Sequence, residues 1–385
     1  MIVVTDPSAC SGCTACMSVC AHHAIEMKPD ALGFKFPVVD TGRCIGCGLC
    51  DSVCPFNENY DSSLNLSAPV AFAARHRNIE EVATSRSGAV FIALSEKILQ
   101  DGGAVYGAAL SENFTIEHKR AVARQELDRF KGSKYVQSDL GTVFSQVKSD
   151  LRAGMKVLFS GTPCQTAGLA AFVGGRYRDS LYLVDIICHG VASPAVWNDY
   201  LEYLKKKEND RILSVNFRDK NIFGWSGLHK ESFVFERKGT KTYAYTFYNP
   251  YMLRRSCNNC HFANLRRPSD ITLGDLWGWT NVAPEFNKDD KGVSLVICNT
   301  AKGLDLYGFV SDALYSKRID IRKCMQHNLA APTPEDPRRE AFERDYEMYG
   351  FRYVMKKYGD IGLARQVKRG IRFVGRMCNK IKKMV

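Results

Sequence analysis

The chain has 385 residues, 45% of them hydrophobic, which is long enough for two or more domains with buried cores. Its formal net charge is +12, but residues 351–385 alone hold eleven Lys or Arg and one acidic residue, so the charge is concentrated at one end. No zinc finger, helix-turn-helix or aromatic ribonucleoprotein motif accompanies that charge, and there is no run of 18 apolar residues, which argues against a nucleic-acid partner and a membrane-spanning helix.

The first 58 residues contain two cysteine runs with the same spacing. Residues 10–20 read CSGCTACMSVC and residues 44–54 read CIGCGLCDSVC, followed by Pro55. The spacing C-x2-C-x2-C-x3-C is the run with which bacterial ferredoxins hold two 4Fe-4S clusters. Three cysteines on a tight loop hold one cluster, and the fourth, expected at the start of a short helix, reaches the other cluster. We therefore predict one cluster on Cys10, Cys13, Cys16 and Cys54, and a second on Cys44, Cys47, Cys50 and Cys20.

Two other uses of these cysteines fit the sequence less well. Disulfides suit secreted chains, and the apolar run at residues 1–4 is too short for a signal peptide. Structural zinc usually takes paired C-x2-C knuckles. Fifteen cysteines without a signal sequence predict a reducing, cytoplasmic compartment, and the clusters indicate an anaerobic or oxygen-protected cell.

A polar segment at 59–68 is expected to be a linker, and after it apolar strands alternate with helices. The short apolar runs at 156–161 and 181–188 are typical of buried parallel strands. The sequence predicts an α/β domain with antiparallel insertions, appended to a ferredoxin-like module. The other predicted elements are strands at 70–75, 104–110, 270–278 and 292–300, helices at 87–103 and 194–210, and a hairpin of 230–237 with 241–248.

Four later cysteines follow predicted strands or lie in a loop between them. Cys164 follows the strand at 156–161, and Cys188 ends the strand at 181–188. Cys257 and Cys260 form a C-x2-C pair. Because the carboxyl ends of parallel strands meet in one crevice, the four cysteines could converge on one metal centre. The alternative is separate buried cysteines with a lone zinc half-site.

Several ordered motifs then resemble one family. They are GSKYVQS, SGTPCQTAGL, DIICHGVASPAVWNDYL, FRDKNIFGWS and RRSCNNCHFANLRRPSDITLGDLWG. The chain resembles the coenzyme F-420 hydrogenase/dehydrogenase beta-subunit family, with residues 69–150 and 151–325 as the two parts of its domain. The resemblance implies a mixed α/β flavin-binding domain that holds FAD and a third 4Fe-4S cluster, with Cys164, Cys188, Cys257 and Cys260 as the matching ligands.

The resemblance also indicates where FAD would bind. Glycines and hydroxyl residues at helix starts suit a pyrophosphate, and Lys134 could balance its charge. The family usually has two glycines after the serine, whereas this chain has Gly88 and then Ala89, so the methyl group puts close approach of the backbone to the cofactor in question. The expected contacts are Ser85, Ser87, Gly88, Gly132, Ser133, Lys134, Tyr135, Gly161, Thr162 and Trp277, with Trp277 equally well placed in the core.

Two residues are candidates for catalysis. His189 follows Cys188 and could donate a proton, or could only support the cluster, and Asp275 could line the flavin pocket. Four arginines flank the C-x2-C pair and could offset a negative cluster or attract an anionic substrate. They are Arg254, Arg255, Arg266 and Arg267.

The predicted function is an iron–sulfur flavoprotein oxidoreductase. FAD would exchange a hydride with a small molecule, either the deazaflavin F-420 or an unknown substrate in a bacterial glycan-assembly setting. Single electrons would pass through the clusters to a redox partner protein or electron-accepting subunit. The alternative is a non-catalytic iron–sulfur electron carrier or assembly partner.

Residues 326–385 are predicted to form a connector and a short helical tail. From Leu363, apolar residues recur every three or four positions, with Lys and Arg between them. A basic amphipathic helix can lie on an anionic membrane surface, which would place the protein peripherally at the inner face of the membrane. The same helix could instead dock on the body of the protein with its charges solvated.

Overall fold

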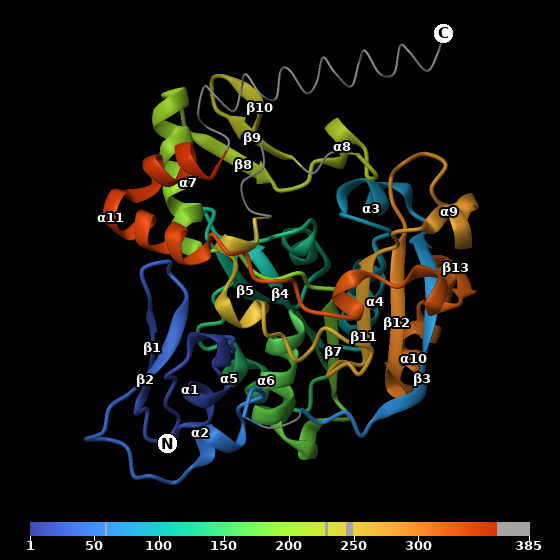
Figure 1. Ribbon diagram of the computed structural model, residues 1–385. Helices are drawn as coiled ribbons and strands as arrows, with labels where there is room; N and C mark the ends of the chain where they lie inside the picture. The colour runs from blue at the N-terminus through green and yellow to red at the C-terminus, as the bar shows by residue number, and fades with distance from the viewer. Residues whose placement is uncertain (58–59, 228–229, 244–248, 360–385) are drawn as a thin grey trace.

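The computed structural model describes residues 1–57, 60–227, 230–243 and 249–359. Its largest unit is an eight-stranded mixed sheet, and the ferredoxin-like module lies against one side of that unit (Figure 1). The strands run in the order β13-β3-β12-β11-β7-β6-β4-β5. Their bounds are β3 Asn65–His76, β4 Ala104–Leu110, β5 Ile116–Ala121, β6 Val157–Gly161, β7 Leu181–Ile186, β11 Ile271–Asp275, β12 Ser294–Thr300 and β13 Leu314–Ile319.

The centre of this sheet is parallel, as the apolar runs predicted. Strands β4, β6, β7 and β11 pair in parallel, while β5, β12, β3 and β13 add antiparallel edges. Strand β3 begins at Asn65, inside the segment expected to be a linker, because its first residues continue the pairing with β12. Because the central strands are apolar and parallel, both faces of the sheet must be buried, and helices cover both of them.

Alternate residues of β6 show how the two faces are covered. Val157 and Phe159 pack with α5 (Val143–Arg152) and α6 (Pro163–Val173), whereas Leu158 packs with α4 (Val90–Gln100) and α10 (Ala301–Phe309). The period of two along the strand thus places one helix pair on each face. Helices α3 (Ile79–Thr84), α8 (Lys220–Phe223) and α9 (Trp279–Val282) are short connections.

The N-terminal module has two cysteine loops and a hairpin. Helix α1 (Ala15–Val19) contains Cys16 and α2 (Leu49–Ser52) contains Cys50, so the third cysteine of each run lies in a short helix. The expectation that the fourth cysteine begins a helix is wrong: Cys20 follows the last residue of α1. Strands β1 (Ile25–Pro29) and β2 (Lys35–Val39) form the antiparallel hairpin.

The hairpin tip docks on the main domain. The Leu32 carbonyl accepts hydrogen bonds from Ser193 Oγ at 2.6 Å and from the Ala195 amide at 3.1 Å, at the start of α7 (Pro194–Glu208). A Cβ on Gly33, whose φ is +80°, would lie 2.9 Å from that amide. The module is therefore packed into the domain at this turn.

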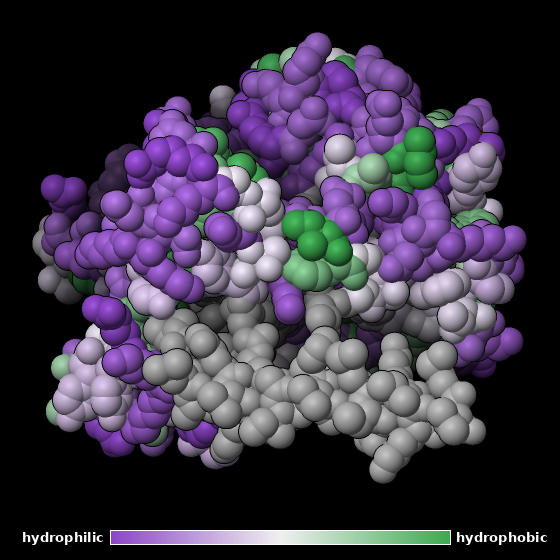
Figure 2. All heavy atoms as spheres, turned by 90° about the horizontal axis from the view of Figure 1, so that it is seen from above, coloured by the Kyte–Doolittle hydropathy of each residue, from purple (hydrophilic) through white to green (hydrophobic). Residues whose placement is uncertain are grey.

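A second, smaller sheet lies beside α7. Strands β8 (Ile212–Asn216), β9 (Glu231–Phe235) and β10 (Gly239–Tyr243) are antiparallel, and β9 with β10 confirm the expected hairpin as far as residue 243. An aromatic core joins this sheet to α7 and to α11 (Arg339–Lys357), a helix that the sequence analysis did not predict. Hydrophilic residues cover most of the described surface on the face drawn in Figure 2, where hydrophobic residues form small separate groups.

The amphipathic tail predicted from Leu363 onward lies outside the described residues, as do residues 244–248 of the hairpin. Within the part of the chain that is described, no helix is both long and apolar enough to cross a membrane.

Candidate cluster and cofactor sites

The structure gathers the cysteines that were predicted to form the second cluster. Cys20 lies beside the other run, and a small cavity of about 20 Å³ is lined by Cys20, Cys44, Cys47 and Cys50, hereafter the second cysteine set. Its rim is open: Cys47 is exposed, and the Ile45 side chain is 66% exposed. This arrangement is the crossed one expected from the ferredoxin spacing.

Cys10, Cys13, Cys16 and Cys54, hereafter the first cysteine set, lie deeper. Burial raises the pKa of Cys16 to about 12, and the nearby charges of Cys10 and Cys54 add to that effect. Cys13 is buried against α6, where a Cβ on Gly168 would lie 2.7 Å from Cys13 Sγ. The first set is therefore enclosed between the module and the main domain.

The module offers thiolates the donors that cluster ligands need. Backbone amides donate to sulfur from Gly12 to Cys10 Sγ at 3.4 Å, from Ile2 to Cys50 Sγ at 3.3 Å and from Ala24 to Cys20 Sγ at 3.4 Å. Such N–H···S bonds stabilise a negative sulfur and tune a bound cluster. None of the described cysteines forms a disulfide. The residues therefore fit iron–sulfur clusters.

A third cysteine set surrounds a cavity inside the main domain. Cys164 lies in the first turn of α6, Cys188 follows β7, and Cys257 ends a short 3-10 helix shortly before Cys260. All four line one cavity of about 30 Å³, which also has Ser11 of the first cysteine loop in its wall. Strands β6 and β7 are parallel neighbours, so their carboxyl ends bring Cys164 and Cys188 to the same edge.

The wall of the third set is tightly packed, and its thiols are buried. Among the described residues, no three or more His, Cys, Asp or Glu side chains are arranged to hold a single metal ion. Gly190, with φ +124°, closes the wall: a Cβ there would lie 3.0 Å from Cys257 Cβ and 2.8 Å from Leu253 Cδ1. Its amide donates to Cys188 Sγ at 3.4 Å. Burial raises the pKa of Cys257 to about 12 and that of Cys260 to about 11, so metal binding there would displace thiol protons.

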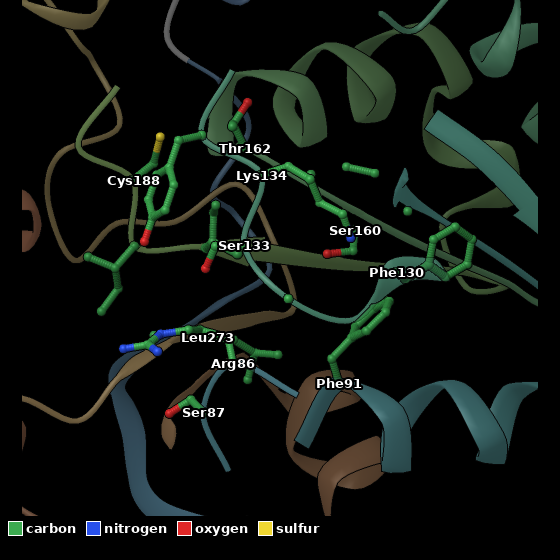
Figure 3. Close-up of a pocket in the computed structure, with 18 of the residues that line it drawn as sticks. Arg86, Ser87, Phe91, Phe130, Ser133, Lys134, Ser160, Thr162, Cys188 and Leu273 are labelled. Carbon is green, nitrogen blue, oxygen red and sulfur yellow. The ribbon is translucent and has the colours of Figure 1, made fainter. Parts of the chain in front are cut away.

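A long cavity of about 320 Å³ adjoins the third set. Figure 3 shows Phe91 and Phe130 at one end, Cys188 and Arg86 towards the other, and Lys134 between them. Most of the expected FAD contacts line it. They are Ser85, Ser87, Gly132, Ser133, Lys134, Tyr135, Gly161 and Thr162.

Two expected FAD contacts lie elsewhere. Gly88 is not in the wall of the long cavity; a Cβ there would lie 2.2 Å from the Ala74 carbonyl oxygen, so this glycine allows the chain to pack on the sheet. Trp277 stacks on Trp225 with ring centroids 5.0 Å apart, in a cluster of hydrophobic side chains. Ala89 does line the cavity, in a left-handed conformation with φ +61° at the start of α4.

The long cavity contains polar atoms that a ligand could satisfy. Ser85 Oγ and His118 Nδ1 are buried and have no hydrogen-bond partner among the described residues. The Ser160 carbonyl lies 3.0 Å from His118 Nε2 and can only accept, so Nε2 carries the proton and Nδ1 is an acceptor. Burial lowers the pKa of His118 to about 4 and that of Lys134 to about 7. The cavity therefore offers a ligand one neutral hydrogen-bond acceptor, His118 Nδ1, and one lysine, Lys134, whose charged form a bound anion would stabilise.

The candidate catalytic residues lie at the cysteine end of the long cavity. The His189 ring stacks on Tyr135 at 5.6 Å between centroids, and burial lowers the pKa of its imidazole, which favours the neutral form. Asp275 is held by Arg218 Nη1 at 2.7 Å and by Trp225 Nε1 at 3.1 Å. Because Asp275 is already paired with a guanidinium, its position supports a role in holding the wall rather than in proton transfer.

Several residues of this cavity were not predicted from the sequence. Arg86 lies between Ser85 and Ser87, two of the expected FAD contacts, and its guanidinium donates to the Arg218 and Trp225 carbonyls. His118 is a single histidine on β5, and Phe91 and Phe130 are apolar residues that a core would equally use. The position of Arg86 between two expected FAD contacts could have indicated it, whereas His118, Phe91 and Phe130 have no local sequence signal.

Comparisons with known proteins identify the class of molecule. Residues 9–57 match the family model described as a 4Fe-4S dicluster domain, so the chain is an iron–sulfur protein. Residues 154–324 match the family model for the C terminus of the beta subunit in coenzyme F420 hydrogenase/dehydrogenase. The chain therefore matches this beta-subunit family over residues 154–324 and a 4Fe-4S dicluster domain at its N-terminus, which supports an iron–sulfur oxidoreductase.

No curated protein matches the chain. Among solved structures, it is similar to a chain of the xenon-derivatized F420-reducing NiFe hydrogenase complex from Methanosarcina barkeri. The two are 15% identical, with a TM-score of 0.46, and the match covers 80% of this chain and 98% of that chain.

Proposed function

We propose that the protein is an FAD- and 4Fe-4S-dependent oxidoreductase that passes electrons between a hydride-exchanging small molecule and ferredoxin-type clusters. The observation that carries this proposal is the position of Cys188, which lines both the long cavity and the cavity of the third cysteine set. Bound FAD would supply exchange of two electrons with the small molecule and of single electrons with the clusters. The chain's own residues would bind, orient and shield these groups.

The long cavity supports FAD binding through three kinds of contact. Lys134 lines the cavity, and its Nζ donates to the Arg129 and Lys131 carbonyls, which hold a cation in the wall where a pyrophosphate could bind. Ser85 and His118 offer unpaired polar atoms within the described part of the chain. Phe91 and Phe130 provide aromatic surface for a planar ring at the end farther from Cys188.

The order of the cluster sites supports a route out of the long cavity. The third cysteine set would hold a cluster next to it. Ser11, between Cys10 and Cys13, lines the wall of that cavity, so the first set comes next. The second set, with Cys47 exposed, comes last and is where a redox partner protein or an electron-accepting subunit would meet the chain.

The substrate class follows from the family and stays part of the proposal. The family description names coenzyme F420, a deazaflavin that exchanges hydride. A different hydride donor or acceptor, including one from bacterial glycan assembly, would use the same cavity and the same route.

The test is anaerobic purification followed by iron, zinc and flavin analysis. We expect roughly twelve iron atoms per chain, for three cubane clusters, and one FAD. Cys188→Ala should lower iron by roughly four and slow transfer from flavin to clusters, whereas Cys298→Ala, at a buried cysteine of β12, should change neither. Protein with full iron and no flavin would reject the enzyme in favour of an electron carrier, and roughly eight iron atoms plus zinc would reject the third cluster.

A further inference from the structure

Arg254 differs from the other three arginines that flank the C-x2-C pair. Arg255 pairs with Glu343, Arg267 Nη2 lies 2.9 Å from Asp185 Oδ1, and Arg266 Nη2 donates to Ser62 Oγ at the surface. Arg254 is 1% exposed. Within the described residues, no carboxylate lies within ion-pair distance of Arg254. Each of the other three has a partner that explains its position without a cluster.

The guanidinium of Arg254 lies between the module and the main domain. Nε donates to the Cys10 carbonyl at 2.7 Å, Nη2 to the Lys35 carbonyl at 2.9 Å, and Nη1 to Gln137 Oε1 at 3.0 Å. Nη2 also lies 3.7 Å from Cys10 Sγ. A Cβ on Gly12 would lie 3.0 Å from Nη1, so the first cysteine loop must present bare backbone to this side chain.

These neutral oxygens satisfy the hydrogen bonds of Arg254 but leave its charge without a counter-ion among the described residues. Burying an unpaired charge is costly, and guanidinium groups stay protonated in proteins. Burial raises the pKa of Asp30, and the charge of Arg254 opposes that effect only from beyond ion-pair distance. The remaining candidates for a counter-ion are the cysteine sites on either side.

Both of those sites are close to the guanidinium. Arg254 lines the cavity of the third cysteine set and donates towards Cys10 Sγ of the first set. A cubane with four thiolate ligands is an anion, and its negative charge grows by one when it takes an electron. A fixed cation between two such groups favours the reduced form of each.

We propose that Arg254 is the shared counter-charge of two neighbouring clusters, the one on the first cysteine set and the one on the third, and that it raises the reduction potential of both. The part that concerns the first set rests on the 4Fe-4S dicluster domain alone, and the part that concerns the third set rests on the proposed function. Arg254 is a positioning residue in this scheme, since no electron needs to reside on it.

The experiment is a redox titration of full-length, cluster-loaded protein, followed by electron paramagnetic resonance. Arg254→Gln should lower the midpoint potential of the first cluster, and of the third where present. The ratio of reduced to oxidised cluster at a given potential should fall at least tenfold, which corresponds to about 59 mV for one electron. Arg254→Lys keeps the charge and should stay within half of that shift. The midpoint potential of the second cluster should not change. Arg266→Gln removes the same charge from the same loop at an exposed position and serves as the matched control.

Three outcomes would overturn the proposal. Unchanged potentials in fully loaded Arg254→Gln would show that the charge is not felt, and an equal drop in Arg254→Lys would show that packing rather than charge is responsible. An equal drop in Arg266→Gln would show a general effect of net charge. If Arg254→Gln fails to load, loading of Arg254→Lys with little change in potential would show that the charge is needed at this position, and failure of both variants would assign the effect to packing and overturn the proposal. Absence of a third cluster in wild-type protein would reject the proposed function while the first cluster still tests Arg254.

Discussion

The second and third cysteine sets have the same chemistry but opposite surroundings. The second set is assembled by a sequence repeat within the first 54 residues, and its rim is open: a Cβ on Gly46 or Gly48 would meet no atom within 4 Å. The third set is drawn from residues almost 100 positions apart, and its wall closes so tightly that a Cβ on Gly190 would lie 2.8 Å from Leu253 Cδ1 and 3.0 Å from Cys257 Cβ. In the proposed function, the exposure of the second set would serve exchange with a partner, and the burial of the third set would serve transfer inside the protein.

The largest expected effect tests how the second set is assembled. Cys20→Ala should remove the cluster on Cys44, Cys47 and Cys50, with a loss of roughly four iron atoms per chain, and should leave the cluster beside it in sequence intact. Mössbauer or paramagnetic resonance spectra of the loaded protein measure which cluster remains. Selective loss of the cluster on Cys10, Cys13 and Cys16 would reverse the assignment.

A glycine substitution at each site tests the difference in packing. Gly190→Ala should prevent loading of the third set and lower the free energy of unfolding by about 3 kcal/mol, because it combines an unfavourable backbone conformation with overpacking. Gly46→Ala, with φ +71° but open space around it, should cost only about 1 kcal/mol and leave the second cluster in place. Urea unfolding and iron content give both values, and equal effects at the two positions would contradict the comparison.

Alkaline pH tests the burial of the third set in iron-free protein. Because burial raises the pKa of Cys257 to about 12 and of Cys260 to about 11, the folded chain keeps these protons after the unfolded chain has lost them near its ordinary pKa of 9.0. Stability from these thiols is present below pH 9 and is lost as pH rises towards those values, by about 1.4 kcal/mol per pH unit for each thiol.

Urea unfolding at pH 8 and pH 10 measures that slope, with Cys257→Ala as the comparison. The variant should lose roughly half of the slope due to the two thiols, and cluster-loaded protein should lack it, since its cysteines hold no protons. A slope that does not change in the variant would mean that other groups cause it.

The smallest effect concerns the wall of the long cavity. Gly48 begins α2 of the open site with φ +76°, and Ala89 begins α4 with φ +61°. Ala89→Gly should relieve the strain of the left-handed conformation, because glycine adopts it without a steric penalty. The free energy of unfolding should rise by up to about 1 kcal/mol, after subtraction of the extra entropy that glycine gives the unfolded chain. Thermal unfolding measures the change. A decrease would mean that the alanine methyl group contributes more by packing than the strain costs.

The same contrast explains how much could be predicted from the sequence. The ferredoxin cysteines were predictable because their spacing is local, and β4, β6 and β7 because short apolar runs indicate buried strands. Helix α11 was missed because its buried Phe342, Phe351 and Val354 alternate irregularly with charged residues and a non-helical Gly350 interrupts it.

The residues of the candidate cofactor sites could likewise be predicted only in part. Cys164 and Cys188 could be placed together because parallel strands share one edge, and Cys257 and Cys260 were expected to join them from a loop, while the resemblance to a family implied that all four are cluster ligands. His118 and Phe130 could not be identified, since they reach the long cavity through the pairing of β5 with β4 and the packing beside it. Nothing local distinguishes them from core residues.

The contact at the hairpin tip bears on how such chains could exchange parts. Ser193 Oγ donates a hydrogen bond to the Leu32 carbonyl and accepts one from the Val196 amide in the first turn of α7. One hydroxyl therefore contacts both a turn of the module and a helix of the domain. An electron-carrying module grafted from another protein would need a turn carbonyl at the position of Leu32 and a glycine after it. Recombination between such proteins is therefore constrained by the shape of one turn, whichever clusters the donor module carries.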